Sequence, residues 1–267
     1  MAAPEGGSNV EPGRERRRSD LVEATSKSFE IVRSLKEDGS AGLTDIAARL
    51  GYSKSTVHRH LQTLSAEGYV AKGDDGYRVG LLFLDYGIHV RNNNSLYRVA
   101  KPKVDELSAE LGEKVWLATA ENGYCVHLYH AAGKHPVRTY TRDGYRGPLH
   151  AFASGKAILA FMDDERVEDI IDRRGLPEIT AETITDQSSL REELAQVRER
   201  GVAFNREESI AGINAVAAPV LEASGRPRGS ICIAGPANRL KGPYFEKELT
   251  DLLLGVANEI EVNLNYE

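Results

Sequence analysis

Residues 43–78 contain two short amphipathic segments followed by a hairpin, and this order constrains the fold more than any other feature of the chain. Apolar residues recur at helical spacing in residues 44–50 and again in residues 53–64, and Gly51 between them permits a tight turn. Residues 69–79 then alternate as strands on both sides of a glycine-bounded turn. The sequence therefore predicts a winged helix-turn-helix, which presents one helix to a DNA groove.

Capping residues mark where these helices should begin. Thr44 is expected to cap the first helix of the motif, and Ser53 is expected to cap the second. An earlier helix is expected from Lys27 to Lys36. Together with the wing, these helices predict a DNA-binding domain over residues 20–80.

The second helix of the motif has a clear apolar stripe. Val57, Leu61 and Leu64 lie at i, i+4 and i+7, so the polar side chains between them should face solvent. Hydroxyl groups suit close approach to phosphate or a base edge, and an arginine can bind guanine with two hydrogen bonds. The alternatives are an exposed polar face without a ligand and, in the wing, merely solvated charges. The residues predicted to contact double-stranded DNA are Ser53, Lys54, Ser55, Thr56, His58, Arg59, Lys72 and Arg78.

The sequence after residue 80 predicts an α+β organisation. Residues 81–112 form a linker helix region, broken near Asn92–Asn94 and suited to a dimer contact. Residues 113–267 form a second domain that mixes strands and helices. Its strands are expected at 115–120, 124–129, 137–141, 202–204, 213–221 and 229–234, with two or three helices over 153–200 and a long helix over 245–264.

Composition limits the environment and the partners. No apolar run is long enough to span a membrane and no hydrophobic signal region begins the chain, so we expect a cytoplasmic protein. Residues 1–80 hold 12 basic and 12 acidic side chains, so the rest carries the whole net charge of −6. Residues 1–19 are expected to be a disordered tail, whose basic segment Arg14–Arg18 either reaches DNA or is only solvated.

Several chemical motifs can be set aside. A phosphate-binding GxxxxGK loop would need glycine where the chain has His150, and Lys156 is followed by alanine. His150 and Ser154 lack the G-x-S-x-G context of a hydrolase. Two cysteines are too few for a disulfide framework, and both are expected to be buried free thiols. No standard zinc spacing joins Cys125, His127, His130 and His135, so no metal or cofactor is expected.

Three stretches of the chain show a family resemblance. They are similar to blocks of the IclR family of bacterial and archaeal transcription regulators. The stretches are Ser53–Arg59 with the short wing, Gly147–Ala160 (GPLHAFASGKAILA), and Gly201–Pro219 followed by Ile233–Pro236. The resemblance covers roughly residues 22–265. It implies a GAF-like second domain with a curved antiparallel sheet and an effector pocket, and a homodimer or a dimer of dimers on a palindromic operator. Organic acids, aromatic acids or sugar derivatives are the implied effectors.

The resemblance also assigns a candidate effector site. The turn before residue 153 leads into a helix whose first N–H groups suit a carboxylate, and small residues on the strands leave room for a ligand. The family often has Asp or Ser at the position of Asn205 and Cys at that of Ala215, so the effector here need not be a familiar one. Ordinary core packing is the alternative. The candidate residues are Arg142, Tyr145, His150, Ala153, Ser154, Asn205, Ile213, Ala215, Cys232 and Ala234.

A ligand-responsive transcription regulator is therefore the function that the sequence favours. A non-specific DNA-binding protein and a metabolite-converting enzyme fused to a DNA-binding module are the alternatives. The missing catalytic motifs weigh against the enzyme, and the acidic total charge weighs against non-specific binding.

Overall fold

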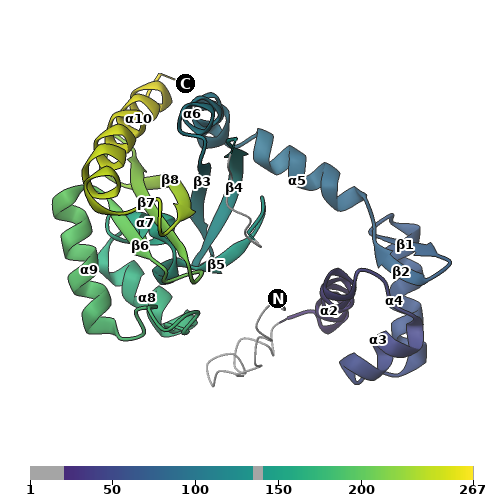
Figure 1. Cartoon of the computed structure of the whole chain (residues 1–267). Coiled ribbons are helices and arrows are strands. Elements are labelled where there is room, and N and C mark those ends of the chain that lie inside the picture. The colour runs from purple at the N-terminus through teal and green to yellow at the C-terminus, as the bar shows by residue number, and fades with distance from the viewer. Residues whose placement is uncertain (1–20, 135–140, 267) are drawn as a thin grey trace. The chain divides into compact units, whose positions relative to one another are not determined.

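The computed structural model describes residues 21–134 and 141–266 of the 267-residue chain. The chain divides into two compact units between Ile88 and His89 (Figure 1). The predicted tail and its basic segment lie outside the described residues. No helix in the described ranges is both long and apolar enough to cross a membrane.

The first unit contains the three predicted helices. They are α2 (Glu23–Asp38), α3 (Leu43–Leu50) and α4 (Lys54–Ala66), so α2 begins earlier than expected. The predicted cap at Thr44 is wrong, because α3 begins at Leu43 and its N-cap is Gly42, whose carbonyl accepts from the N–H groups of Asp45 and Ile46. The three helices enclose one core of Ile31, Leu35, Ile46, Val57, Leu61 and Val70.

The wing follows as β1 (Val70–Gly73) and β2 (Gly76–Val79), which pair antiparallel around a two-residue turn. Gly76 is required here, because its φ is 113° and a Cβ would lie 2.5 Å from the carbonyl oxygen of Ala41. An additional bridge joins Ala41 to Tyr77 and attaches the wing to the α2–α3 connection. The winged helix-turn-helix is therefore present, with a third short strand position that the sequence pattern did not predict.

Two helices occupy the predicted linker region. They are α5 (Leu82–Asn92) and α6 (Ser95–Leu111), and the break between them falls where the three asparagines predicted it. Asn94 caps α6 by accepting a hydrogen bond of 3.3 Å from the backbone N–H of Tyr97. No residue of α5 is buried, whereas α6 packs against the sheet of the second unit.

The second unit is built on a six-stranded antiparallel sheet of order β5-β4-β3-β8-β7-β6. Its strands are β3 (Lys114–Glu121), β4 (Tyr124–Ala132), β5 (Arg146–Pro148), β6 (Ala203–Arg206), β7 (Ile213–Leu221) and β8 (Pro227–Pro236). Of the strand predicted at 137–141, residues 137–140 lie outside the described residues and Thr141 belongs to no strand. The edge position beside β4 is taken by β5, which the sequence pattern placed in a turn.

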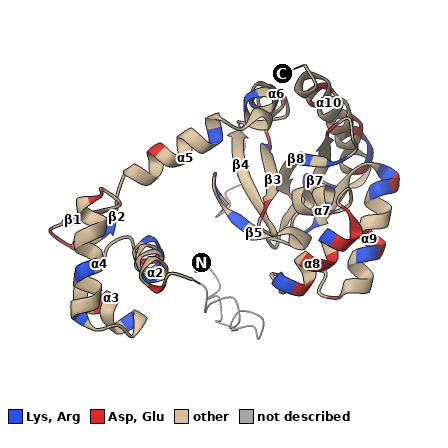
Figure 2. Cartoon of the chain, turned by 180° about the vertical axis from the view of Figure 1, so that it is seen from behind, with Lys and Arg blue, Asp and Glu red and all other residues tan. Residues whose placement is uncertain are grey.

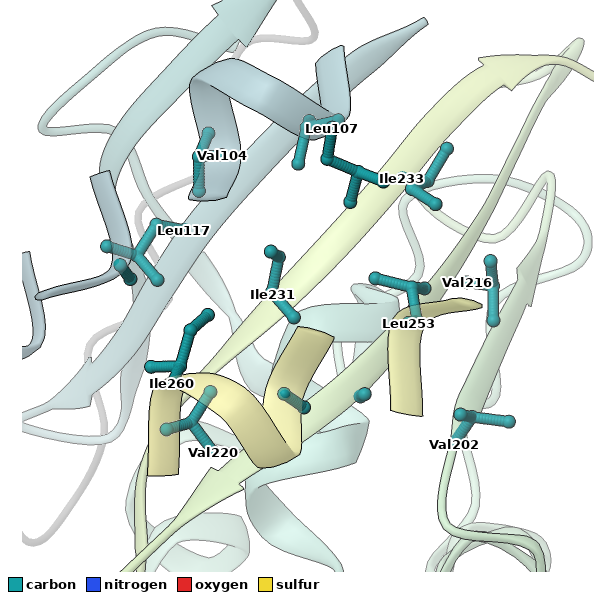
Figure 3. Packing of buried hydrophobic residues seen from close by; sticks show 14 of the residues in the cluster. Val104, Leu107, Leu117, Val202, Val216, Val220, Ile231, Ile233, Leu253 and Ile260 are labelled. Atoms are coloured by element: carbon teal, nitrogen blue, oxygen red, sulfur yellow. The ribbon is translucent and has the colours of Figure 1, made fainter. Parts of the chain in front are cut away.

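Helices cover both faces of this sheet. On one face, α6 and α10 (Leu249–Leu264) pack over the side chains of Leu117, Val216, Ile231 and Ile233 (Figure 3). A π-helical turn over Tyr244–Glu248 precedes α10. On the other face lie α7 (Ala153–Leu159), α8 (Asp164–Arg174) and α9 (Gln187–Arg200).

The centre of the second face is lined by small side chains. They include Ala118, Ala215, Ala217, Cys232 and Ala234, all buried. The alternation of strand residues explains the division, because neighbours along a strand point to opposite faces. We call this second side the α7 face. The family resemblance had pointed to three of these small residues, Ala215, Cys232 and Ala234. The fold confirms an α+β domain with a curved antiparallel sheet.

Candidate nucleic-acid interface and ligand-binding face

The orientation of α4 is fixed by its apolar stripe. Val57 and Leu61 are fully buried, and Ser53 caps the helix by accepting a 3.1 Å hydrogen bond from the N–H of Thr56. The cap prediction at Ser53 is thus confirmed. Ser53 and Thr56 also join their hydroxyls at 2.8 Å, so both serve the helix end.

Four of the predicted DNA-contacting residues lie together on the outer side of α4. They are Lys54, Ser55, His58 and Arg59, all exposed. Gln62 is exposed one turn beyond His58 and continues the same side, and the sequence analysis missed it although the spacing of four residues would have shown it. Glutamine can bind adenine with two hydrogen bonds.

The cations of this surface are available to a ligand. Neither Lys54 nor Arg59 forms an ion pair with any described residue, and α4 carries no acidic residue in its first turn (Figure 2). The imidazole of His60 instead turns inward and meets the hydroxyl of Ser28 at 2.8 Å. The outer side of α4 thus combines unpaired positive charge with short polar side chains, as a phosphate- and base-contacting helix requires.

The two basic residues of the wing are both exposed but do not share a side of the hairpin. Lys72 pairs with Tyr77 across the strands and its ammonium lies 5.8 Å from the centroid of that ring. Arg78 is paired with Ala71, in the next position along the strands, and so points to the opposite side. Lys72 and Arg78 therefore lie on opposite faces of the wing, and the two cannot both contact DNA that lies against one of these faces.

The candidate effector residues of the strands come together on the α7 face. Lys114, Ala234, Ala215 and Asn205 are paired in turn across β3, β8, β7 and β6, so they form one row across the sheet. Trp116, Cys232 and Ala217 form the neighbouring row. Ile213 lies two residues before Ala215 and is half-buried at the edge of the same face.

The first residues of α7 lie directly over these rows. Ala153 and Ser154 are buried, and no side chain caps the helix at its N-cap residue Phe152. Burial raises the pKa of the Cys232 thiol to about 12, and a hydrogen bond with Ser154 opposes this rise only in part. Both cysteines are buried free thiols, as predicted.

Asn205 is already engaged within the protein. Its Nδ2 donates to the carbonyl of Ala151 at 2.7 Å, and its Oδ1 accepts from the N–H of Glu208 at 3.2 Å. The amide thus ties the turn before α7 to the connection after β6. A ligand contact at Asn205 would have to replace one of these bonds.

Beneath α7 lies a buried ion pair that the sequence analysis did not predict. The Nζ of Lys156 donates to both carboxylate oxygens of Glu208, at 2.8 and 2.7 Å, and lies 3.3 Å from Glu193. Lys156 is 1% exposed. Burial raises the pKa of Glu208, and the ammonium of Lys156 opposes that rise. The lysine that resembled part of a phosphate loop therefore holds α7 to two distant carboxylates.

His150 turns away from the rows of small residues. Its Nε2 lies 3.1 Å from the carbonyl oxygen of Pro177, and it borders a hollow of about 10 Å³ against α8. Burial lowers the pKa of His150. Ser154 and His150 thus have separate partners, which gives a hydrolytic pair no support.

The segment before β5 places Tyr145 near the α7 face and leaves Arg142 exposed. The ring of Tyr145 lies 5.7 Å from that of His127 and 6.0 Å from that of Phe152. No three metal-binding side chains come together among the described residues. His135, one of the residues of the possible zinc cluster, lies outside the described ranges.

We expect the buried imidazole of His127 to make the protein sensitive to acid. Burial lowers the pKa of His127 to about 4, with the Tyr145 backbone opposing and Lys114 reinforcing the change. The unfolded chain titrates this residue near pH 6.5, so unfolding takes up a proton between pH 6.5 and 4. This one group should therefore cost about 3 kcal/mol of stability as pH falls through that window. Urea unfolding at pH 7 and pH 4.5 measures the change.

His127→Gln is the control for the acid effect. It removes the titrating group, so its loss of stability between the two pH values should be smaller than that of the unaltered chain. Equal losses in the two proteins would show that His127 is not the cause. Burial also lowers the pKa of His150, so some loss of stability in acid should remain in this variant.

An exposed helix that carries Lys54 and Arg59 within a winged helix-turn-helix defines the class of DNA-binding proteins. Comparison with known families agrees. Residues 24–74 match the IclR helix-turn-helix domain, and residues 88–262 match the bacterial transcriptional regulator IclR C-terminal domain. The chain belongs to the IclR family of transcription regulators.

Individual relatives match over nearly their full length. ArcR of Halobacterium salinarum is 31% identical over 265 residues, which is 98% of each chain. The HTH-type transcriptional regulator KdgR of Escherichia coli is 31% identical over 249 residues, 92% of this chain and 94% of KdgR. The crystal structure of IclR from Thermotoga maritima superposes with a TM-score of 0.73 at 28% identity, covering 90% of this chain and 98% of that one. These relatives are named as regulators rather than enzymes.

Proposed function

We propose that this chain binds a palindromic operator through α4 and the wing, and that a small organic acid, aromatic acid or sugar derivative bound at the α7 face alters that binding. The protein would act in the cytoplasm. The single observation that carries the DNA half is the positive charge of Lys54 and Arg59 on the exposed side of α4, where neither forms an ion pair with a residue of the described ranges. An IclR homolog of Microbacterium hydrocarbonoxydans with the same fold has been solved in complex with 4-hydroxybenzoate, which supports an aromatic acid as one candidate ligand.

The packing of the α7 face explains how a ligand would act. Ala215, Cys232 and Ala234 are buried under α7, so a ligand can enter only if α7 or the segment carrying Tyr145 moves. A ligand that binds one arrangement better than another shifts the balance between them. The same movement can change how two DNA-binding units are held in a dimer.

Titration of the full chain with its own upstream DNA tests the proposal. We expect tighter binding to that DNA than to a scrambled duplex of the same length and composition, by a factor of 10³ or more at physiological salt, as specific regulators show. Equal affinity for both would favour the non-specific DNA-binding protein instead. The salt dependence of both affinities should be measured in parallel.

We also propose that a second copy of the chain covers the apolar surface of α5. Leu84 and Ile88 are exposed large hydrophobic residues on this helix, Leu81 is exposed immediately before it, and Phe29 on α2 is exposed as well. The first unit also has an apolar groove of about 450 Å³ between α2 and α4, bordered by Phe83. Exposed apolar surface on this scale marks an interface, and the family's implied dimer supplies the occupant.

Leu84→Glu should weaken the dimer. A buried charge without a partner in the interface should raise the dimer dissociation constant at least tenfold, measured by sedimentation equilibrium. Asp85→Asn, on the same helix and already exposed, is the matched control and should leave the dissociation constant within about twofold. An unchanged dissociation constant for Leu84→Glu would place the interface elsewhere.

A further inference from the structure

A cluster of polar and aromatic side chains occupies the β4 end of the α7 face. Lys114 and Trp116 come from β3, His127 and His130 from β4, and Asp143 from the segment that precedes β5. The ammonium of Lys114 lies 4.3 Å from the centroid of the Trp116 ring, and the His127 and His130 rings lie 4.7 and 4.6 Å from it. The Trp116 ring is thus in contact with all three basic side chains.

Two of these basic side chains are buried. Lys114 is 6% exposed and His127 is 4% exposed. The Nδ1 of His127 is fully enclosed and makes no hydrogen bond with any described residue. A buried polar atom without a hydrogen bond is uncommon, because it costs the free energy of its lost hydration. A ligand that accepts or donates a hydrogen bond at this atom would recover that cost.

One carboxylate already faces the cluster. Asp143 places Oδ1 2.6 Å from Nδ1 of His130 and Oδ2 3.1 Å from the guanidinium of Arg91. It is the acidic group that acts electrostatically on both Lys114 and His127. Asp143 therefore acts on two cations of the cluster, Arg91 and Lys114, and burial lowers the pKa of Lys114 while Asp143 opposes that change.

The cluster is continuous with the candidate effector residues. Lys114 lies in one row with Ala234 and Ala215, and Trp116 lies beside Cys232 in the next. The side chains between the cluster and Asn205 are small, so a ligand held at the cluster would extend across alanines. A flat, unsaturated body would find the indole of Trp116 at one end of that path.

We propose that Lys114, Trp116 and His127 form the subsite that binds the carboxylate of the effector, and that the effector is a small carboxylic acid with a flat body. This inference rests on the proposed function, whose effector class it narrows. The carboxylate would lie between the ammonium of Lys114 and Nδ1 of His127, in competition with Asp143. Because Asp143 also holds Arg91 near the end of α5, such competition would loosen a contact of the linker helix.

Fluorescence offers a direct test, because Trp116 is the single tryptophan of the chain. Benzoate, pyruvate and 2-furoate are titrated into the full chain, each beside its amide. We expect saturable changes in Trp116 emission with at least one acid, and a dissociation constant at least tenfold weaker for its amide. Calorimetry on the same pairs checks the affinities. Absence of binding by all three acids, or equal binding of acids and amides, overturns the subsite.

Variants then locate the binding. Lys114→Met and His127→Phe should each weaken the acid at least tenfold, whereas Lys241→Met, an exposed lysine elsewhere in the same unit, should not. Asp143→Asn should instead tighten binding about tenfold, because it removes the competing charge. A misfolded variant cannot show this gain. Unchanged affinity in Lys114→Met and His127→Phe would contradict the proposal.

A separate measurement distinguishes this failure from failure of the proposed function. A metabolite that stabilises the chain and alters operator binding, yet does so equally in Lys114→Met and His127→Phe, would leave the regulator intact and remove only this subsite. If no metabolite alters operator binding, the proposed function itself fails, whatever the acids do to Trp116.

Discussion

Lys156→Met is expected to lower the free energy of unfolding by about 3–5 kcal/mol. The substitution leaves Glu208 buried without the ammonium that its two carboxylate oxygens now share, and it also takes a cation from Glu193. The desolvated carboxylate must then either stay charged without a partner or take up a proton. Urea unfolding at neutral pH measures the loss.

Two controls separate this effect from a simple loss of charge. Arg191→Met breaks the exposed ion pair with Glu168 and should cost less than about 1 kcal/mol. Lys156→Met combined with Glu208→Leu replaces both partners by apolar groups, and should recover a large part of the loss. A single Lys156→Met variant within about 1 kcal/mol of the unaltered chain would show that the pair does not hold α7 in place.

Arg59→Ala is expected to weaken operator binding by about 1–3 kcal/mol, a factor of roughly 5 to 150. Arg59 is exposed on the outer side of α4 and forms no ion pair with a described residue, so its loss should not disturb the fold. Fluorescence anisotropy with the operator measures the change. If Arg59 binds a base, random DNA should lose less affinity than the operator; equal losses would indicate a phosphate contact.

Arg33→Ala is the matched control for the DNA contact. Arg33 is an exposed arginine on α2 of the same unit, outside the outer side of α4. Its substitution should change operator affinity by less than about threefold, through net charge alone.

Any thermal stabilisation by an effector should persist in Arg59→Ala. Undiminished operator affinity in Arg59→Ala would mean that α4 is not the recognition helix.

The DNA-binding unit was predictable because its signals are local. Gly51 adopts φ 67°, Ser53 caps α4, and Val57 and Leu61 lie four residues apart, so a short stretch of chain determines the helix and its exposed side. The prediction that Thr44 caps α3 was wrong because glycine can also occupy the N-cap position of a helix, and Gly42, two residues earlier, does so here. The attachment of the wing through Ala41 depended on a pairing that no local pattern contains.

The second unit was predictable in its elements but less so in its contacts. The family resemblance grouped Ala215, Cys232 and Ala234 at one site, and the structure places them on one face of the sheet. Lys156 and Glu208 are 52 residues apart, and only the fold brings them together. The basic cluster around Trp116 depends on the register of β3 with β4, which shifts at an irregularity between Leu117 and Ala118. A one-residue shift changes which side chains face the same side, so alternation alone could not assign it.

We propose that a metabolite bound in the second unit controls DNA binding by the first. The most direct test of this proposal is the operator affinity of the full chain with and without a ligand that stabilises it; at about 100 times its dissociation constant such a ligand should add about 2.7 kcal/mol of stability. We predict a change in operator affinity of roughly 5- to 150-fold, a coupling of about 1–3 kcal/mol. A ligand that produces the full stabilisation and leaves operator affinity unchanged would contradict the account.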